Sequence, residues 1–120
     1  MKQTPSELKK RLAEFCRSAG GCIGAAVMNM DGVVVASYVR SESDELHLTA
    51  MLSGALGIGE RAAKELKLGA LENVIIVGDE GIAVLSVCGE DRAIMALFED
   101  SARLGLTLHD VRELARELQT

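Results

Sequence analysis

The chain has 120 residues and a formal net charge of −5, from 18 acidic and 13 basic side chains. This length predicts a single domain over residues 1–120 that can bury a true core, and the negative charge argues against nucleic acid as a partner. Aromatic residues make up only 2% of the chain, so the core must be aliphatic and offers no platform for stacking bases or flavins. No apolar run reaches the ~18 residues that span a bilayer, so we expect no membrane segment.

The cysteines are Cys16, Cys22 and Cys88, an odd number at wide spacing that matches no zinc pattern. Nothing in the sequence reads as a signal peptide. We therefore expect three free thiols in a reducing cytoplasm.

The first third of the chain predicts a helix followed by two strands. Thr4 is a suitable N-cap and Pro5 a suitable first helical residue, so a helix is expected over residues 5–19, ended by two glycines. Apolar runs over residues 22–30 and 33–39 predict strands. The Asp31-Gly32 turn between them predicts an antiparallel hairpin.

Residues 43–69 predict one long helix around which the rest of the chain is organised. Ser43 is the expected N-cap and Gly69 the expected left-handed C-terminal residue. One apolar stripe at helical spacing is expected to face the core; it comprises Leu48, Met51, Leu52, Ala55, Ala62, Ala63 and Leu66.

A second line of mostly small residues runs roughly opposite that stripe, through Leu46, Ala50, Gly54, Gly57 and Arg61. Each mid-helix glycine costs about 1 kcal/mol relative to alanine, so two of them suggest that another surface approaches this backbone closely. Pairing with another helix is one explanation. A kink, or packing under the protein's own loops, is the other.

The second half of the chain predicts three strands and a helix. Residues 73–77 and 82–88 are expected strands, whereas the composition of residues 92–98 fits strand or helix; short, regularly spaced turns favour a three-stranded meander. Apolar residues from Leu104 to Leu118 predict the last helix, with Ser101 or Thr107 as its cap. The elements together predict an α/β fold, a five-stranded, mostly antiparallel sheet with helices on its faces.

The sequence shows no catalytic constellation and no cofactor or metal site. His47 and His109 lie on different predicted helices without partners at metal-ligand spacing. Residues 57–62 resemble a dinucleotide-binding turn but lie inside a helix, and a phosphate loop is missing. We interpret Arg61 as a surface residue rather than an arginine finger, and the acidic turns at 79–80 and 90–91 as solvated.

The order of elements, the Met30-Asp31-Gly32 hairpin, the long helix rich in small residues and the Leu104-Gly105-Leu106 step together resemble the roadblock / dynein light chain domain family. The likeness covers the whole chain and is to the bacterial and archaeal type, related to the gliding-motility partner of a Ras-like GTPase. It implies a profilin-like fold with sheet order 2-1-5-4-3, the long helix on one face and the other two helices on the opposite face. It also implies a homodimer in which the long helices pack antiparallel and the third strands pair.

The resemblance further implies a scaffold or regulator without catalytic residues, and some members stimulate GTP hydrolysis by their partner. We therefore expect a cytoplasmic homodimeric adaptor for a Ras-like small GTPase. The expected dimer interface comprises Leu46, Ala50, Gly54, Gly57, Arg61, Val74, Ile75, Ile76 and Val77; the expected partner-binding flank comprises Glu45, Thr49, Ser53, Glu60 and Lys64.

Two other functions are alternatives to the adaptor. A small-molecule sensor would need a cavity lined by a few polar groups, and the aliphatic pattern gives no indication of one. A thiol enzyme would use Cys22 or Cys88, but both lie in apolar strands that raise a thiol pKa.

Overall fold

The computed structural model describes residues 3–39, 42–99 and 103–119. The elements in chain order are α1 (Pro5–Ser18), β1 (Cys22–Asn29), β2 (Val34–Val39), α2 (Glu42–Glu65), β3 (Asn73–Gly78), β4 (Gly81–Cys88), β5 (Arg92–Glu99) and α3 (Leu104–Leu118). Residues 92–98, whose composition did not decide between strand and helix, lie in strand β5. The predicted order of elements is confirmed.

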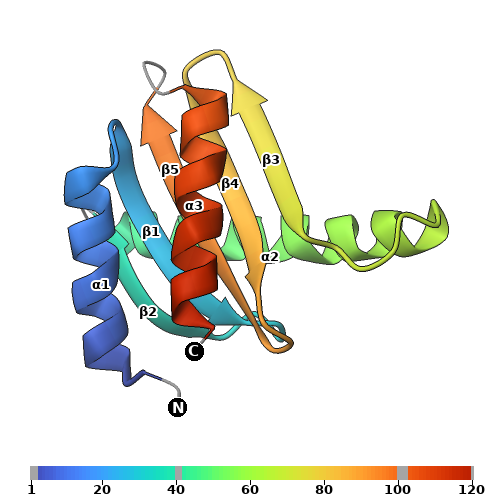
Figure 1. Ribbon diagram of the computed structural model, residues 1–120, viewed down its shortest axis with the longest axis horizontal. Coiled ribbons are helices and arrows are strands. Elements are labelled where there is room, and N and C mark those ends of the chain that lie inside the picture. The colour runs from blue at the N-terminus through green and yellow to red at the C-terminus, as the bar shows by residue number, and fades with distance from the viewer. Residues whose placement is uncertain (1–2, 40–41, 100–102, 120) are drawn as a thin grey trace.

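The five strands form one antiparallel sheet in the order β2-β1-β5-β4-β3. Helices α1 and α3 cover one face of the sheet, and α2 crosses the other face (Figure 1). The predicted sheet order and the predicted distribution of the helices are confirmed. Strands β2 and β3 are the two edges, so each pairs on one side only among the described residues.

Two apolar clusters hold these layers together, one on each face of the sheet. The larger joins α1 and α3 to the sheet and includes Leu12, Phe15, Phe98 and Leu114; the rings of Phe15 and Phe98 meet edge to face at 6.4 Å. The smaller lies under α2 and consists of Ala26, Met28, Leu48, Leu52, Leu56, Leu85, Ala93 and Met95. The scarcity of aromatic residues makes both clusters almost wholly aliphatic.

The local turn and cap predictions are borne out at the start of the chain. The Thr4 hydroxyl oxygen accepts a hydrogen bond from the Glu7 backbone N–H at 3.2 Å, with Pro5 next to it in the first turn. Gly32 in the β1–β2 hairpin has φ of +92°, a left-handed conformation that glycine adopts without a Cβ penalty.

The cysteine prediction is wrong at two of three positions. Cys16 and Cys22 are joined by a disulfide, and Cys88 is free and buried. The short turn between α1 and β1 brings the two Cα atoms within 5.0 Å, inside the range that a disulfide bridges. Sequence spacing alone does not reveal this approach.

The predicted caps of the other two helices also differ from the structure. Helix α2 begins at Glu42, so Ser43 lies inside it. Thr107 lies inside α3, where its hydroxyl donates to the Leu104 carbonyl at 2.9 Å; Ser101 is outside the described residues.

Candidate interaction surface

Helix α2 is longer than the sheet it covers and extends past the edge strand β3 (Figure 1). Its first half is anchored by Leu48, Leu52 and Leu56, all buried against the sheet. Past Ala63 no described residue of the helix or its end is buried, and Leu66 and Leu68 are 68% and 71% exposed. The protruding end therefore exposes apolar side chains, because the chain's own sheet does not extend beneath it.

The end of α2 is set by a lysine rather than by the predicted glycine. Lys67 has φ of +59°, and the backbone N–H groups of Lys67 and Leu68 donate to the carbonyls of Lys64 and Ala63. This pair of bonds is a Schellman motif with Lys67 at the left-handed position. The predicted C-terminal residue Gly69 lies beyond it.

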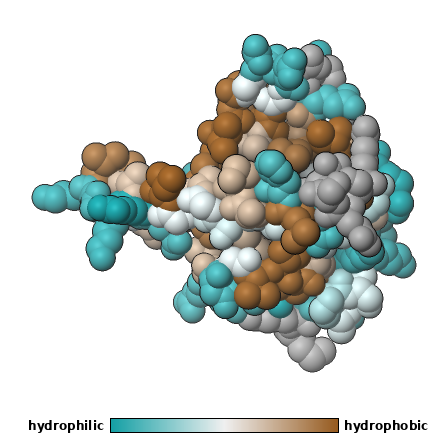
Figure 2. Space-filling model, turned by 180° about the vertical axis from the view of Figure 1, so that it is seen from behind, coloured by the Kyte–Doolittle hydropathy of each residue, from teal (hydrophilic) through white to brown (hydrophobic). Residues whose placement is uncertain are grey.

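Beside the first half of α2, part of the sheet face remains uncovered. An apolar cavity of about 430 Å³ lies there. All five strands contribute to its lining, through Ile23, Gly24, Val39, Ile76, Ala83 and Leu97. On the helix side it is closed by His47, Leu48, Met51 and Leu52. Figure 2 shows hydrophobic surface on this face of the molecule and near the protruding end of the helix. The sequence pattern did not reveal this cavity.

The cavity reaches the free edge of the sheet at β3. Ile75, Ile76 and Val77 are 40%, 47% and 61% exposed, and β3 carries no charged residue. An apolar, uncharged edge strand is a template for pairing with another strand.

The predicted apolar stripe of α2 is correct only in part. Leu48, Leu52 and Ala63 are buried as predicted, and Leu56 joins them although it was not in the predicted stripe. Met51 and Leu66 are exposed instead. Met51 lies on the flank that faces the uncovered strip, and Leu66 lies past the edge of the sheet.

The glycine line of α2 is open. A Cβ built on Gly54 or Gly57 would have no atom within 4 Å other than neighbouring helix atoms, whereas a Cβ on Gly59 would lie 2.7 Å from Val74 Cγ2. Helix α2 continues unbroken through these positions. The described loops therefore do not pack on Gly54 or Gly57, and the close approach of the protein's own chain is at Gly59.

The other predicted interface residues on α2 are exposed: Leu46, Ala50 and Arg61, the last in an ion pair with Glu65 at 3.3 Å. On β3, Val74 is half-buried because it packs into the cluster under α2. These positions form two surfaces, the outer side of α2 and the β3 edge.

The predicted partner-binding flank is only partly accessible. Thr49 is 7% exposed, and its hydroxyl donates to the Glu45 carbonyl at 2.9 Å, so it offers little surface to a partner. Ser53 is half-buried beside Gly32 of the hairpin. Glu60 and Lys64 are both exposed and lie about one helical turn apart.

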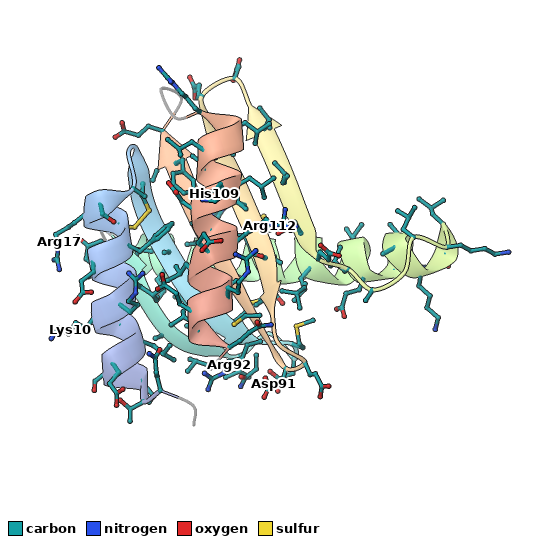
Figure 3. All side chains as sticks on the ribbon, viewed as in Figure 1. Lys10, Arg17, Asp91, Arg92, His109 and Arg112 are labelled. Atoms are coloured by element: carbon teal, nitrogen blue, oxygen red, sulfur yellow. A yellow bond between two sulfur atoms is a disulfide. The ribbon has the colours of Figure 1, made fainter. Side chains whose placement is uncertain are left out.

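The two histidines lie on opposite sides of the sheet. His47 lines the apolar cavity on α2, while His109 is on α3 on the opposite side of the sheet (Figure 3). Burial raises the pKa of the Cys88 thiol, an effect that nearby Arg92 opposes and Asp91 reinforces. In the described ranges, no group of three or more His, Cys, Asp or Glu side chains has the arrangement of a metal site. No helix within these ranges is long and apolar enough to cross a bilayer.

Comparisons with known proteins agree with this architecture. The family model of the Roadblock/LC7 domain matches residues 8–98. The uncharacterized protein MJ1340 of Methanocaldococcus jannaschii is 31% identical over 99 residues, which cover 82% of this chain and 86% of that protein.

Three solved structures show the same fold. A Roadblock/LC7 domain from Streptomyces avermitilis has a TM-score of 0.84 at 16% identity and covers 92% of this chain and 93% of its own. The gliding protein MglB from Thermus thermophilus has a TM-score of 0.81 at 19% identity, covering 99% and 91%. Profilin II from Acanthamoeba castellanii has a TM-score of 0.55 at 14% identity, covering 92% and 95%, so the predicted profilin-like fold is confirmed.

Proposed function

Because the chain belongs to the Roadblock/LC7 domain family, we propose that it is a non-catalytic homodimeric adaptor that binds a Ras-like small GTPase and modulates its GTP hydrolysis. The observation that carries the proposal is the uncovered apolar strip of the sheet, which adjoins a free edge strand and a helix that extends past this edge. Contiguous apolar surface of this kind marks an interaction site.

We infer that the molecule covering this surface is a second copy of the chain. If β3 pairs antiparallel with β3 of another copy about a two-fold axis, the protruding end of each α2 lies under the sheet of the other copy. Ile58 and Leu66, which are exposed in one chain, then cover the partner's cavity beside Met51. Such a contact pairs the free edge strand β3 and buries the uncovered apolar strip, which explains why both are open in a single chain.

The GTPase partner follows from the family resemblance rather than from a nucleotide site. The structural relatives include a gliding protein, MglB, and the type that the chain resembles acts with a Ras-like GTPase. In the proposed dimer two copies of α2 lie side by side. Glu60 and Lys64, which are exposed in one chain, are the charged residues that we assign to the docking surface. We infer that the GTPase docks over the paired helices, through a contact that is partly electrostatic and weakens with salt.

Dimerisation is tested first, on the full chain. Sedimentation velocity from low to high micromolar concentration is expected to show a dimer, which typically buries at least ~1,000 Å² in total. Gly57→Leu is expected to weaken the dimer by separating the helices, while leaving the fold intact because the site is open in one chain. A monomer throughout this range contradicts the dimer.

The partner is tested with Ras-like GTPases from the same genome, each loaded with GDP or a non-hydrolysable GTP analogue. Interferometry is expected to detect binding to at least one of them, and the double reversal Glu60→Lys with Lys64→Glu to weaken it. The matched control is Lys10→Glu with Glu14→Lys, an exposed pair of the same spacing on α1. If the α2 reversal has no more effect than the α1 reversal, the docking surface is elsewhere. If no GTPase binds, the proposed partner is wrong.

A further inference from the structure

The side of α2 that borders the apolar cavity carries four apolar residues of alternating size. Met51 lines the cavity, and Ala55, Ile58 and Ala62 follow it at intervals of four, three and four residues, which places all four along one side of the helix. Met51 and Ile58 are 63% and 72% exposed, whereas Ala55 and Ala62 are half-buried. These four residues form the α2 seam, which shares no residue with the predicted glycine line.

The order of large and small residues makes the α2 seam self-complementary about a two-fold axis. When two copies of α2 run antiparallel, the first residue of one seam lies opposite the last residue of the other. Met51 then packs against Ala62 of the other copy, and Ile58 packs against Ala55. Each large side chain therefore meets a small one, which lets two helices interdigitate closely. A parallel pairing would instead place large against large and small against small.

The centre of this pairing agrees with the position of the sheet edge. Both pairs are centred between Leu56 and Gly57. Helix α2 meets the edge strand β3 at Gly59, where an added Cβ would lie 2.7 Å from Val74 Cγ2. A two-fold axis just outside β3 therefore passes α2 within about one turn of the centre of the seam. Strand pairing at β3 and helix pairing at the seam can share this axis.

We propose that the α2 seam is the contact between the two long helices of the dimer, with Met51 of each copy against Ala62 of the other and Ile58 against Ala55. This inference rests on the proposed dimer and names the residues and the register of its helix contact. The contact buries the two exposed large side chains, and with them the apolar surface that one chain leaves beside the cavity.

Engineered cysteines test the register in the full chain. Within one helix, positions 51 and 62 are about 16 Å apart, too far for a disulfide, so a bond between them forms only across two copies. Met51→Cys with Ala62→Cys is expected to give a covalent dimer under oxidised glutathione, and each single variant is expected to give none. The control, Ala50→Cys with Arg61→Cys, has the same spacing on the glycine line and is expected to give none.

An exchange of sizes tests the same contact without cross-linking. Met51→Ala and Ala62→Met are each expected to raise the dissociation constant of the dimer at least about tenfold, the first by leaving a cavity and the second by overpacking. The two changes together again place a large residue opposite a small one, and are expected to return the dissociation constant to within about threefold of the wild type. The recovery cannot arise within one chain, because the two positions are too far apart to touch.

The outcomes distinguish failure of the seam from failure of the dimer. If the wild type sediments as a dimer but the 51/62 pair cross-links no more than the 50/61 pair, the seam is wrong and the dimer stands. The same conclusion follows if the double exchange is no tighter than the single variants. If the wild type is a monomer at all concentrations, both the dimer and the seam are wrong.

Discussion

Ile76 provides the sharpest test of the proposed dimer, because it belongs both to the β3 edge and to the apolar cavity. Its side chain is 47% exposed in one chain. Burying a whole isoleucine side chain contributes about 1.5–3 kcal/mol, so covering this exposed half contributes about 1 kcal/mol in each copy. The two copies together contribute about 2 kcal/mol, which is a factor of about 30 in the dissociation constant.

Ile76→Lys is therefore expected to weaken the dimer at least thirtyfold, since it removes this burial and also places two like charges near the two-fold axis. The stem of the lysine can still cover the sheet, so the isolated chain should lose no more than about 1 kcal/mol of stability. Sedimentation velocity over a concentration series measures the first effect and urea unfolding the second.

The control for Ile76→Lys is Val33→Lys, which places the same charge at a valine that is 58% exposed in the β1–β2 turn. It is expected to leave the dimer unchanged. A dissociation constant for Ile76→Lys equal to that of the wild type would refute the assignment of β3 to the interface, as would an equal loss in Val33→Lys.

Three further predictions concern stability and ligand binding. In an Ile76→Lys background, Gly57→Ala should stabilise the chain by up to about 1 kcal/mol through helix propensity. Gly59→Ala should be at least about 1 kcal/mol less stable than Gly57→Ala, because the new Cβ would clash with the β-branched side chain of Val74. Equal urea midpoints for the two variants would refute this. Burial raises the pKa of Cys88 in the folded state, so its stabilising effect is complete below the ordinary thiol pKa of about 8.5 and is lost as pH rises above it. The fall in urea stability above that pH should be smaller in Cys88→Ala, and an identical profile would count against it. Calorimetry with GTP and ATP should show no binding to the isolated chain, since it has no phosphate loop; micromolar binding would contradict the site assignment.

Much of the fold could be predicted because its determinants are local. The Thr4-Pro5 start, the Asp31-Gly32 turn and the alternation of apolar runs with turn residues each act within a few positions, and each is found where it was predicted. Sheet order is not local, and it followed only from the family resemblance. The Cys16–Cys22 disulfide was missed because the approach of two Cα atoms to 5.0 Å depends on how α1 packs on the sheet.

The candidate interaction surface could be predicted less well, because burial on a helix depends on where the helix ends relative to the sheet. Apolar spacing alone predicts that all four of Leu48, Leu52, Met51 and Leu66 are buried. Their burial depends on how far the sheet extends under the helix. Leu48 and Leu52 are buried, whereas Leu66 directly follows the end of α2, which extends past β3, and is exposed. Thr49 is a similar case. Its polar side chain suggested exposure, but the residue is buried.

The three glycines of α2 show this limit most clearly. Gly54, Gly57 and Gly59 all lower helix propensity in the same way, so the sequence indicates a close contact without locating it. The structure divides them: Gly59 is where Val74 and Leu71 press on the helix from within the chain, and Gly54 and Gly57 face open space. A contact within one chain explains Gly59 alone. Gly54 and Gly57 carry the same cost in helix propensity without such a contact in the described chain, as the proposed pairing with a second copy requires.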